Sequence, residues 1–162
     1  MMKKILPLLF ACAALVACEV EVKKEVSTEA QAPTLGYDSL LAQKYGADQY
    51  GMKQYVMAFL KSGPNRSQDS ATAAQIQRAH MDNIGRMAEE GKLVLAGPFL
   101  DEQELRGIYI FDVRTIEEAE ALTASDPAVQ AGRLIMELHP WYGSAAMMQI
   151  NETHKRLSKT DI

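Results

Sequence analysis

Gln54-Tyr-Val-Met-Ala-Phe-Leu60 is a continuous apolar run that contains aromatic and β-branched residues. Its length and composition predict a β-strand that is buried on both faces. Ser62-Gly63-Pro64-Asn65 ends this strand, because glycine and proline interrupt regular structure. Beyond a loop, Ser70 is the expected N-cap of a helix that ends at Gly91. One stripe of that helix carries Ile76, His80, Ile84 and Met87.

The segments that follow continue the alternation of strands and helices. We expect strands at residues 92–99 and 106–113, joined by an acidic loop, and a last strand at residues 134–141. Between them, Thr115 and Glu118 form a capping-box pair that opens a helix. Pro127 breaks this helix, and one further turn follows it. The order βαββαβ predicts an α+β, ferredoxin-like fold with one antiparallel sheet and both helices on one face.

The two ends of the chain add shorter segments to this domain. Residues 37–50 predict a short helix that stops at Gly46, and the residues from Ser144 onward predict a C-terminal helix. We therefore divide the chain into a signal peptide (1–17), a tether with a short helix (18–52), the ferredoxin-like domain (53–142) and a C-terminal helical extension (143–162).

One face of the predicted sheet is left without a helix. Because the strands carry apolar residues on both faces, the second face needs a cover, and a second copy of the chain supplies one most simply. The sequence therefore predicts a homodimer.

The N-terminus has the pattern of an export signal. Two lysines precede the apolar run of residues 5–16, which is shorter than the about 20 residues that a membrane-spanning helix needs. Leu15-Val16-Ala17-Cys18 resembles the bacterial lipobox, in which the cysteine is lipidated and becomes the first mature residue. Leu9-Phe10-Ala11-Cys12 is a poorer match, and ordinary cleavage near Ala17 is the alternative. Since Glu19 follows in place of an aspartate, we expect a cell-envelope protein anchored in the outer rather than the inner membrane.

Composition narrows the possible functions. Both cysteines lie in the signal region, so the rest of the chain offers no disulfide, thiolate zinc site or cysteine nucleophile. Without residues 1–17, the chain has 15 basic and 21 acidic residues, a net charge of −6. Nucleic-acid binding surfaces are basic, so we expect no nucleic-acid partner. The three histidines lack metal-ligand spacing, and no phosphate loop or dinucleotide fingerprint is present, so we expect no metal and no cofactor.

His80 and Asp126 are the candidate catalytic residues. His80 stands between Ile76 and Ile84 on the apolar stripe, so its ring points toward the sheet. Asp126 follows a helix on the same side of the sheet. If the two side chains meet, the carboxylate fixes the imidazole tautomer and the histidine can shuttle a proton. A core histidine bonded to the backbone and an Asp-Pro helix cap are the alternatives.

Three further residues are candidates for ligand binding. Ser62 ends the first strand, and Gly97-Pro98 ends the second, where a glycine permits close approach of a ligand or simply makes the turn. Ser62 and Ser125 are the serines nearest to the histidine and the aspartate, but no Gly-x-Ser-x-Gly elbow is present. The sequence therefore gives little support to a serine hydrolase.

Taken together, five short motifs resemble the YCII-related domain family. They are Tyr55-Val-Met-Ala-Phe-Leu60, Arg78-Ala-His80, Leu95-Ala-Gly97-Pro98-Phe99, Ser125-Asp126-Pro127 with Ala131-Gly132, and Pro140-Trp141. The resemblance implies a ferredoxin-like fold that dimerises into an α/β barrel, similar to muconolactone isomerases. It also implies a catalytic His–Asp pair at His80 and Asp126. The few family members with assigned substrates act in the breakdown of chlorinated aromatics.

These features support three functional hypotheses. In the first, His80 and Asp126 carry out acid–base proton transfer, of isomerase or lyase type, on a small cyclic or aromatic-derived molecule. In the second, the same pocket binds a small ligand without turnover. In the third, the chain is a structural, dimeric envelope lipoprotein, and the His–Asp pair is a buried polar contact.

Overall fold

The computed structural model describes residues 36–160, and the residues from Tyr37 onward form one compact unit. The expected signal peptide, the lipidation site Cys18 and most of the tether lie outside the described residues. No helix in the described part of the chain has the length and apolar character required to cross a membrane.

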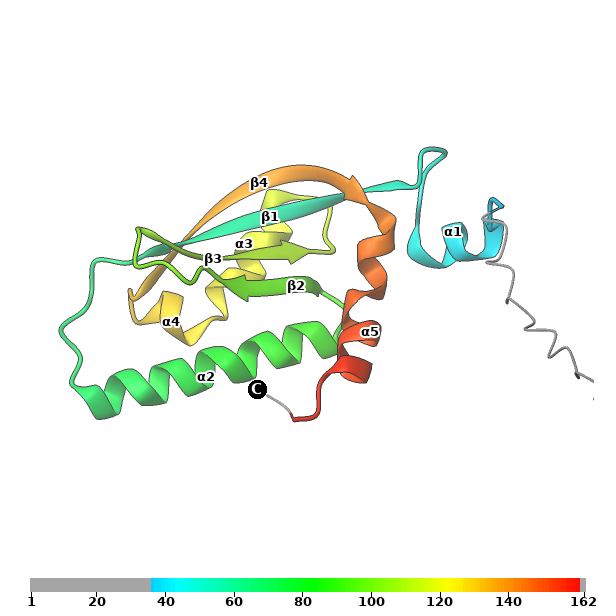
Figure 1. Ribbon diagram of the computed structural model, residues 1–162. Helices are drawn as coiled ribbons and strands as arrows, with labels where there is room; N and C mark the ends of the chain where they lie inside the picture. The colour runs from blue at the N-terminus through cyan, green and yellow to red at the C-terminus, as the bar shows by residue number, and fades with distance from the viewer. Residues whose placement is uncertain (1–35, 161–162) are drawn as a thin grey trace, which may run out of the picture. The chain divides into compact units, whose positions relative to one another are not determined.

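Ten elements make up the described chain (Figure 1). The strands are β1 (Met52–Ser62), β2 (Leu93–Pro98), β3 (Leu105–Phe111) and β4 (Leu134–Ser144). The helices are α1 (Ser39–Tyr45), α2 (Ser70–Glu89), α3 (Ile116–Ala124), α4 (Pro127–Gln130), the 3₁₀ helix η1 (Ala145–Gln149) and α5 (Ile150–Leu157).

The four strands form one sheet in the order β2-β3-β1-β4, and each neighbouring pair is antiparallel. This order, with α2 between β1 and β2 and α3 between β3 and β4, is that of the ferredoxin-like fold. The prediction of the fold class is therefore confirmed. The last strand extends three residues beyond the predicted end at Trp141. It contains Pro140, which is tolerated because β4 lies at the edge of the sheet.

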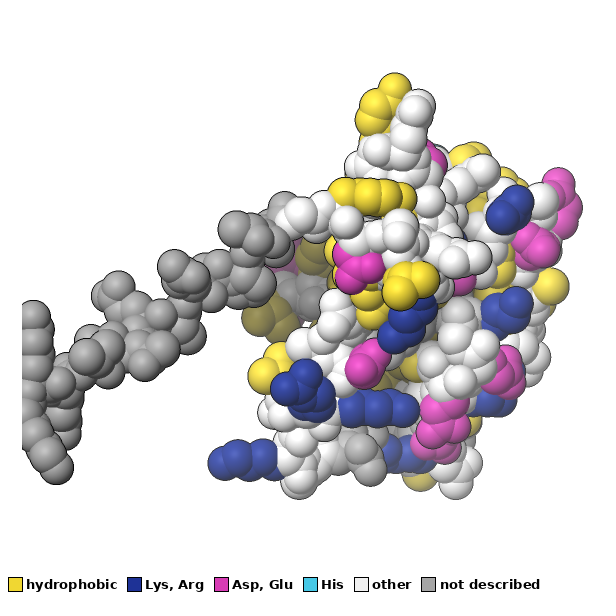
Figure 2. Space-filling view, turned by 90° about the vertical axis from the view of Figure 1, so that its right-hand side faces the viewer, with side chains coloured by type: hydrophobic (Ala, Val, Ile, Leu, Met, Phe, Trp, Pro, Cys, Tyr) yellow, Lys and Arg dark blue, Asp and Glu magenta, His cyan; other side chains and the backbone are white. Residues whose placement is uncertain are grey.

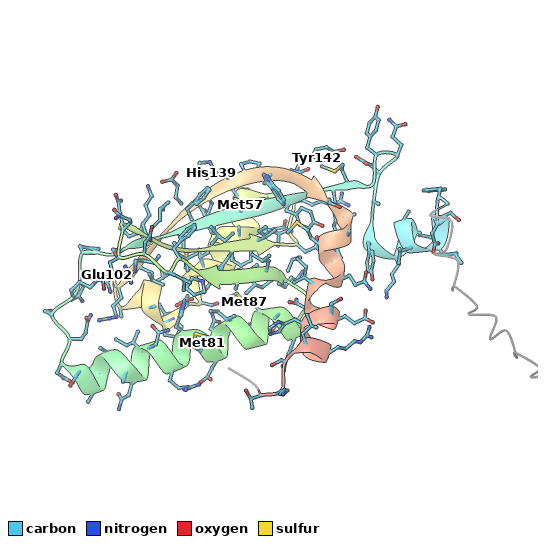
Figure 3. All side chains as sticks on the ribbon, in the orientation of Figure 1. Met57, Met81, Met87, Glu102, His139 and Tyr142 are labelled. Carbon is cyan, nitrogen blue, oxygen red and sulfur yellow. The ribbon has the colours of Figure 1, made fainter. Side chains whose placement is uncertain are left out.

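The main core lies between the sheet and the helices. Alternate residues of β1 and β3 point to this side, where they pack against α2 and α3. The fully buried members include Val56, Ala58, Phe111, Met87 and Ala119. Figure 3 shows Met81 and Met87 on α2, on the side that faces the sheet. This layer fixes the position of α2 relative to β3.

The second face of the sheet is only partly covered by the chain itself. Met147 and Met148 of η1, together with Trp141, pack against Tyr55, Val94 and Ile110. Figure 1 shows the C-terminal segment (orange to red) running past the ends of β4 and β2. On the rest of this face, where Figure 3 labels Met57 and His139, Glu137 forms ion pairs with Lys61 and His139. The second face is therefore more polar, and better covered, than the strand pattern predicts.

Helix ends follow the sequence signals with one exception. The capping box at Thr115 and Glu118 is present, and the end of α1 at Gly46 is left-handed, with a φ of 67°. The predicted N-cap of α2 at Ser70 is wrong by one residue, because the side chain of Asp69 accepts a hydrogen bond from the N–H of Thr72.

Candidate active site

The long helix α2 carries His80 to the middle of its sheet-facing side. The buried residues of α2 are His80, Asn83 and Met87, a spacing that places all three on one helical face. His80 is 7% exposed. The predicted direction of its side chain, toward the sheet, is therefore the one observed.

The second candidate, Asp126, lies in the turn between α3 and α4. It is fully buried and is the N-cap of α4, with Pro127 in the first turn of that helix. Proline suits this position because its fixed φ is helical and it has no N–H to leave unbonded. One carboxylate oxygen of Asp126 accepts the N–H of Ala128 at 2.8 Å. The helix-cap role considered from the sequence is thus present.

Asp126 also contacts His80, 46 positions away in the chain. The Nδ1 atom of His80 lies 3.0 Å and 2.8 Å from the two carboxylate oxygens. An ionised carboxylate only accepts hydrogen bonds, so Nδ1 carries the proton. In the neutral imidazole, Nε2 is then left as the acceptor.

A third residue, Tyr109 of β3, completes this array. Its hydroxyl lies 3.3 Å from Nε2 of His80, and the two rings are stacked with centroids 6.3 Å apart. Burial raises the pKa of Tyr109, and the negative charge of Asp126 raises it further. The phenol therefore keeps its proton at neutral pH and can donate a hydrogen bond.

No motif in the sequence singles out Tyr109. The signal that could have found it is the period-two alternation of β3, which places Gly107, Tyr109 and Phe111 on the helical side of the sheet. Of these, only tyrosine has a polar group that needs a partner when it is buried.

His80 and Tyr109 line a cavity of about 480 Å³ between α2 and the sheet. Pockets for small organic ligands have volumes in this range. Much of the wall is apolar, and it is formed by Leu60, Met81, Ile84, Ala96, Pro98, Ala128 and Leu134. Asp126 is not part of the wall. Only the histidine and the tyrosine of this array can therefore touch a ligand.

The predicted ligand-binding residues differ in their relation to this cavity. Gly97 and Pro98 line it, whereas Ser62 does not and instead accepts a hydrogen bond from Arg66 at 3.0 Å. A Cβ at Gly97 would meet no atom within 4 Å. The close backbone approach occurs at Gly107, where a Cβ would lie 2.5 Å from the carbonyl oxygen of Gly97.

Metal binding has no support from the described residues. Between residues 36 and 160, no group of three or more His, Cys, Asp or Glu side chains is arranged to hold an ion. The array of His80, Asp126 and Tyr109 is instead suited to moving a proton.

Comparison with known proteins places this site in a family. The sequence profile of the YCII-related domain matches residues 55–142, which is more than half of the chain. The chain belongs to the YCII-related domain family. His80, Tyr109 and Asp126 all lie within the matched region of this YCII-related domain.

Comparison with solved structures gives a more distant likeness. 5-Chloro-2-hydroxyhydroquinone dehydrochlorinase from Burkholderia phenoliruptrix AC1100, in complex with 2,5-dihydroxybenzoquinone, is 15% identical to this chain. The TM-score is 0.42, and the match covers 55% of this chain and 93% of the dehydrochlorinase. No protein with a curated description matches the chain significantly.

Proposed function

We propose that this YCII-related domain catalyses proton transfer on a small cyclic or aromatic-derived molecule, in a reaction of isomerase or lyase type. The observation that carries the proposal is the position of His80. It stands in the wall of a ligand-sized cavity, between a buried carboxylate and a buried phenol. A histidine oriented in this way can act as general base and then as general acid.

The proposed reaction begins at Nε2 of His80. This atom removes a proton from a carbon beside a carbonyl group, and the electron pair of the C–H bond moves onto the carbonyl oxygen as an enolate. Where the enolate is conjugated with a carbon–carbon double bond, return of the proton to the far carbon of that system shifts the double bond and completes an isomerisation. Departure of a leaving group with its electron pair completes an elimination instead. Asp126 accepts the hydrogen bond from Nδ1–H throughout, so its carboxylate lies beside the imidazolium that forms.

Tyr109 is the proposed partner of the enolate oxygen. Its raised pKa keeps it protonated, and its hydroxyl, which lies beside Nε2 in the structure, would turn to the carbonyl oxygen of the substrate and so free Nε2 to act as the base. A donor placed where negative charge develops lowers the barrier, because the bond strengthens as the enolate forms. The base and the oxyanion donor are thus adjacent.

The test is exchange of carbon-bound hydrogen with deuterium oxide, followed by proton NMR on a panel of small cyclic ketones and lactones. This assay detects proton abstraction even when the natural reaction is unknown. We expect the chain to accelerate exchange for at least one compound, and His80→Gln to slow that exchange by about a hundredfold or more. His154→Gln, at an exposed position on α5, is the matched control and should exchange at the unaltered rate.

The competing hypotheses predict different results. A binding module would retain an affinity for panel compounds that His80→Gln weakens, but exchange would stay at the uncatalysed rate. A structural protein would show neither affinity nor exchange, and His80→Gln would lower only its stability. Either result would reject the catalytic proposal.

We also propose that two copies of the chain pair through the uncovered part of the second sheet face. Support comes from the partly exposed apolar side chains there, among them Met57, Phe59 and Ile135, which is 50% exposed. Light scattering should give the mass of a dimer, and Phe59→Glu should shift it to that of a monomer. A monomeric mass for the unaltered chain would reject the proposal.

The envelope location remains a proposal that rests on the lipobox-like sequence. We propose that Cys18 is lipidated after export and holds the protein at the outer membrane. Metabolic labelling with palmitate should mark the protein, Cys18→Ser should abolish the label, and Cys12→Ser should retain it. Fractionation of inner and outer membranes would test the destination.

A further inference from the structure

Three arginines line the same cavity as His80. Arg66 comes from the loop after β1, Arg106 from β3 and Arg133 from the residue before β4. No aspartate or glutamate is part of the cavity wall. The cavity is therefore basic, although the whole chain carries a net charge of −4.

None of the three arginines is neutralised by its neighbours in the described chain. Arg66 donates to the hydroxyl of Ser62 at 3.0 Å, Arg106 to the carbonyl oxygen of Gln103 at 3.3 Å, and Arg133 to the side chain of Gln68 at 2.8 Å. These acceptors are uncharged. Within residues 36–160, no carboxylate lies within 4.0 Å of any of the three.

Some basic residues outside the cavity are paired with carboxylates. One guanidinium nitrogen of Arg86 on α2 donates to both carboxylate oxygens of Glu90, and Lys53 is paired with Asp112. On the face shown in Figure 2, Lys and Arg side chains (dark blue) are interspersed with Asp and Glu side chains (magenta). The cavity wall differs from this mixed surface, because three arginines and no carboxylate line it.

Unpaired guanidinium groups around a cavity favour an anionic ligand. Each guanidinium has five N–H donors in a planar fork, and the bonds described above use only one on each arginine. The remaining donors suit the two oxygens of a carboxylate. The apolar part of the wall, formed by residues such as Leu60, Met81 and Ile84, suits a carbon skeleton.

We propose that the His80 cavity binds organic carboxylates, and that Arg66, Arg106 and Arg133 hold the carboxylate group. This inference rests on the proposed function for the identity of the site, and it adds the class of substrate. The carboxylate would fix the orientation of the ligand, so that a carbon beside its carbonyl group faces Nε2 of His80. The same positive charges would favour the enolate over the neutral ketone.

The test uses two probes with the same ring and ketone, the anion 3-oxocyclopentane-1-carboxylate and its neutral methyl ester. Both are cyclic ketones with exchangeable hydrogens, so one pair of compounds reports on binding and on proton transfer. Affinity is measured by NMR titration at low and high salt. We expect the full chain to bind the anion at least about tenfold more tightly than the ester, and salt to reduce the difference.

Substitution of the arginines should remove this preference. Arg106→Gln and Arg133→Gln should each reduce the affinity for the anion by about tenfold and leave the affinity for the ester unchanged. The corresponding lysine variants should retain part of the preference, since they keep the charge without the planar fork. Arg156→Gln on α5, which removes the same charge far from the cavity wall, is the matched control.

Two readouts separate this inference from the proposed function. Equal affinity for the two probes, or no detectable binding of the anion at millimolar concentration, would overturn the carboxylate assignment. Binding of the anion with the expected arginine dependence supports the assignment even if deuterium exchange is absent or insensitive to His80→Gln. That second result would reject the catalytic proposal alone.

Discussion

At the scale of single residues, the ring and the hydroxyl of Tyr109 make different contacts, so their contributions can be measured separately. The ring packs edge-on against Phe111 with centroids 5.7 Å apart, whereas the hydroxyl reaches His80. We predict that Tyr109→Phe slows deuterium exchange by about a hundredfold, since one donor to the enolate oxygen is lost. The melting temperature should change little, because the apolar contacts remain. Exchange kinetics and thermal unfolding measure the two effects.

Tyr55 provides the matched control for this prediction. It is also fully buried, but on the other face of the sheet, where its hydroxyl donates to the carbonyl oxygen of Ser144 at 3.1 Å. Tyr55→Phe should lower stability and leave exchange unchanged. Equal exchange rates in Tyr109→Phe and Tyr55→Phe would show that Tyr109 has no part in the chemistry.

Asp126 is a positioning residue, because it holds His80 without reaching the cavity. We predict that Asp126→Asn disturbs the histidine tautomer, since an amide can donate as well as accept. Nitrogen-15 NMR should show protonated Nδ1 in the unaltered protein and a mixture of tautomers in the variant. The Asp126→Asn variant should also lose about 1–3 kcal/mol of stability, because the hydrogen bonds to a buried carboxylate are weakened. An unchanged tautomer would contradict the assigned role.

Some of these site residues could be identified from the sequence and others could not, for a physical reason. His80 and Asp126 stand out because a polar residue on an apolar stripe and an Asp-Pro step are unusual locally. Tyr109 does not stand out, since tyrosine is common in strands and its partner depends on how α2 lies over β3. The three arginines come from separate segments, so only the folded chain brings them to one cavity.

At the scale of secondary-structure elements, the N-terminus of α3 is sensitive to pH. The N–H groups of Arg114 and Thr115 both donate to Glu118, which holds the pKa of this carboxyl below its ordinary value of 4.5. A lowered pKa means that the stabilisation is present above pH 4.5 and is lost as the pH falls through the lowered value. The Glu118→Gln variant should therefore be less stable than the unaltered chain at neutral pH.

The measurement is thermal unfolding of both proteins across the acidic range. The difference in melting temperature should shrink as the pH falls from 4.5 through the lowered pKa of Glu118, because below that pKa both proteins carry an uncharged side chain at this position. A difference that does not depend on pH would mean that the charge of Glu118 contributes nothing to the capping box.

Replacement by alanine should have opposite effects on stability at two of the glycines. At Gly63, a Cβ would collide with the carbonyl oxygen of Gly132 and lie 2.7 Å from the carbonyl carbon of Arg133. Gly63→Ala should therefore lower the free energy of unfolding by about 3 kcal/mol. At Gly85, within α2, a Cβ would meet no atom within 4 Å, and Gly85→Ala should raise it by about 0.5–1 kcal/mol. Urea unfolding of both variants checks the signs.

The start of a helix was predictable where one residue alone fits the capping position, and less so where two neighbouring residues both fit it. Thr115 and Glu118 identified the start of α3 because both halves of the capping box are encoded locally. At α2, Asp69 and Ser70 are both good capping residues, and only the backbone conformation distinguishes them.

At the scale of the whole molecule, the C-terminal segment acts as part of the core. Met147 and Met148 pack against the cluster of Tyr55, Val94 and Ile110 on the second sheet face. We predict that replacing both methionines with alanine lowers the free energy of unfolding by about 2–4 kcal/mol. Leu157→Ala is the control, since Leu157 is 76% exposed and should change stability little. A loss equal to that of the control would show that η1 does not stabilise the sheet.

The order of strands and helices was enough to predict the sheet, because few topologies join βαββαβ by short connections. The surface against which the C-terminal segment packs was not predictable in the same way. Its amphipathic pattern shows that one side is buried, but not against which surface. The second sheet face therefore looked bare in the sequence, although η1 covers part of it.

The 46-residue separation between His80 and Asp126 has a consequence for how the protein is assembled. One member of the pair belongs to the β1-α2-β2 half of the chain and the other to the β3-α3-α4-β4 half, and the exposed loop between Pro98 and Leu105 joins the halves. Neither half alone contains both His80 and Asp126. A chain cut in this loop would thus recover the proposed proton-transfer activity only when the two fragments reassociate, and that activity would report on their reassociation.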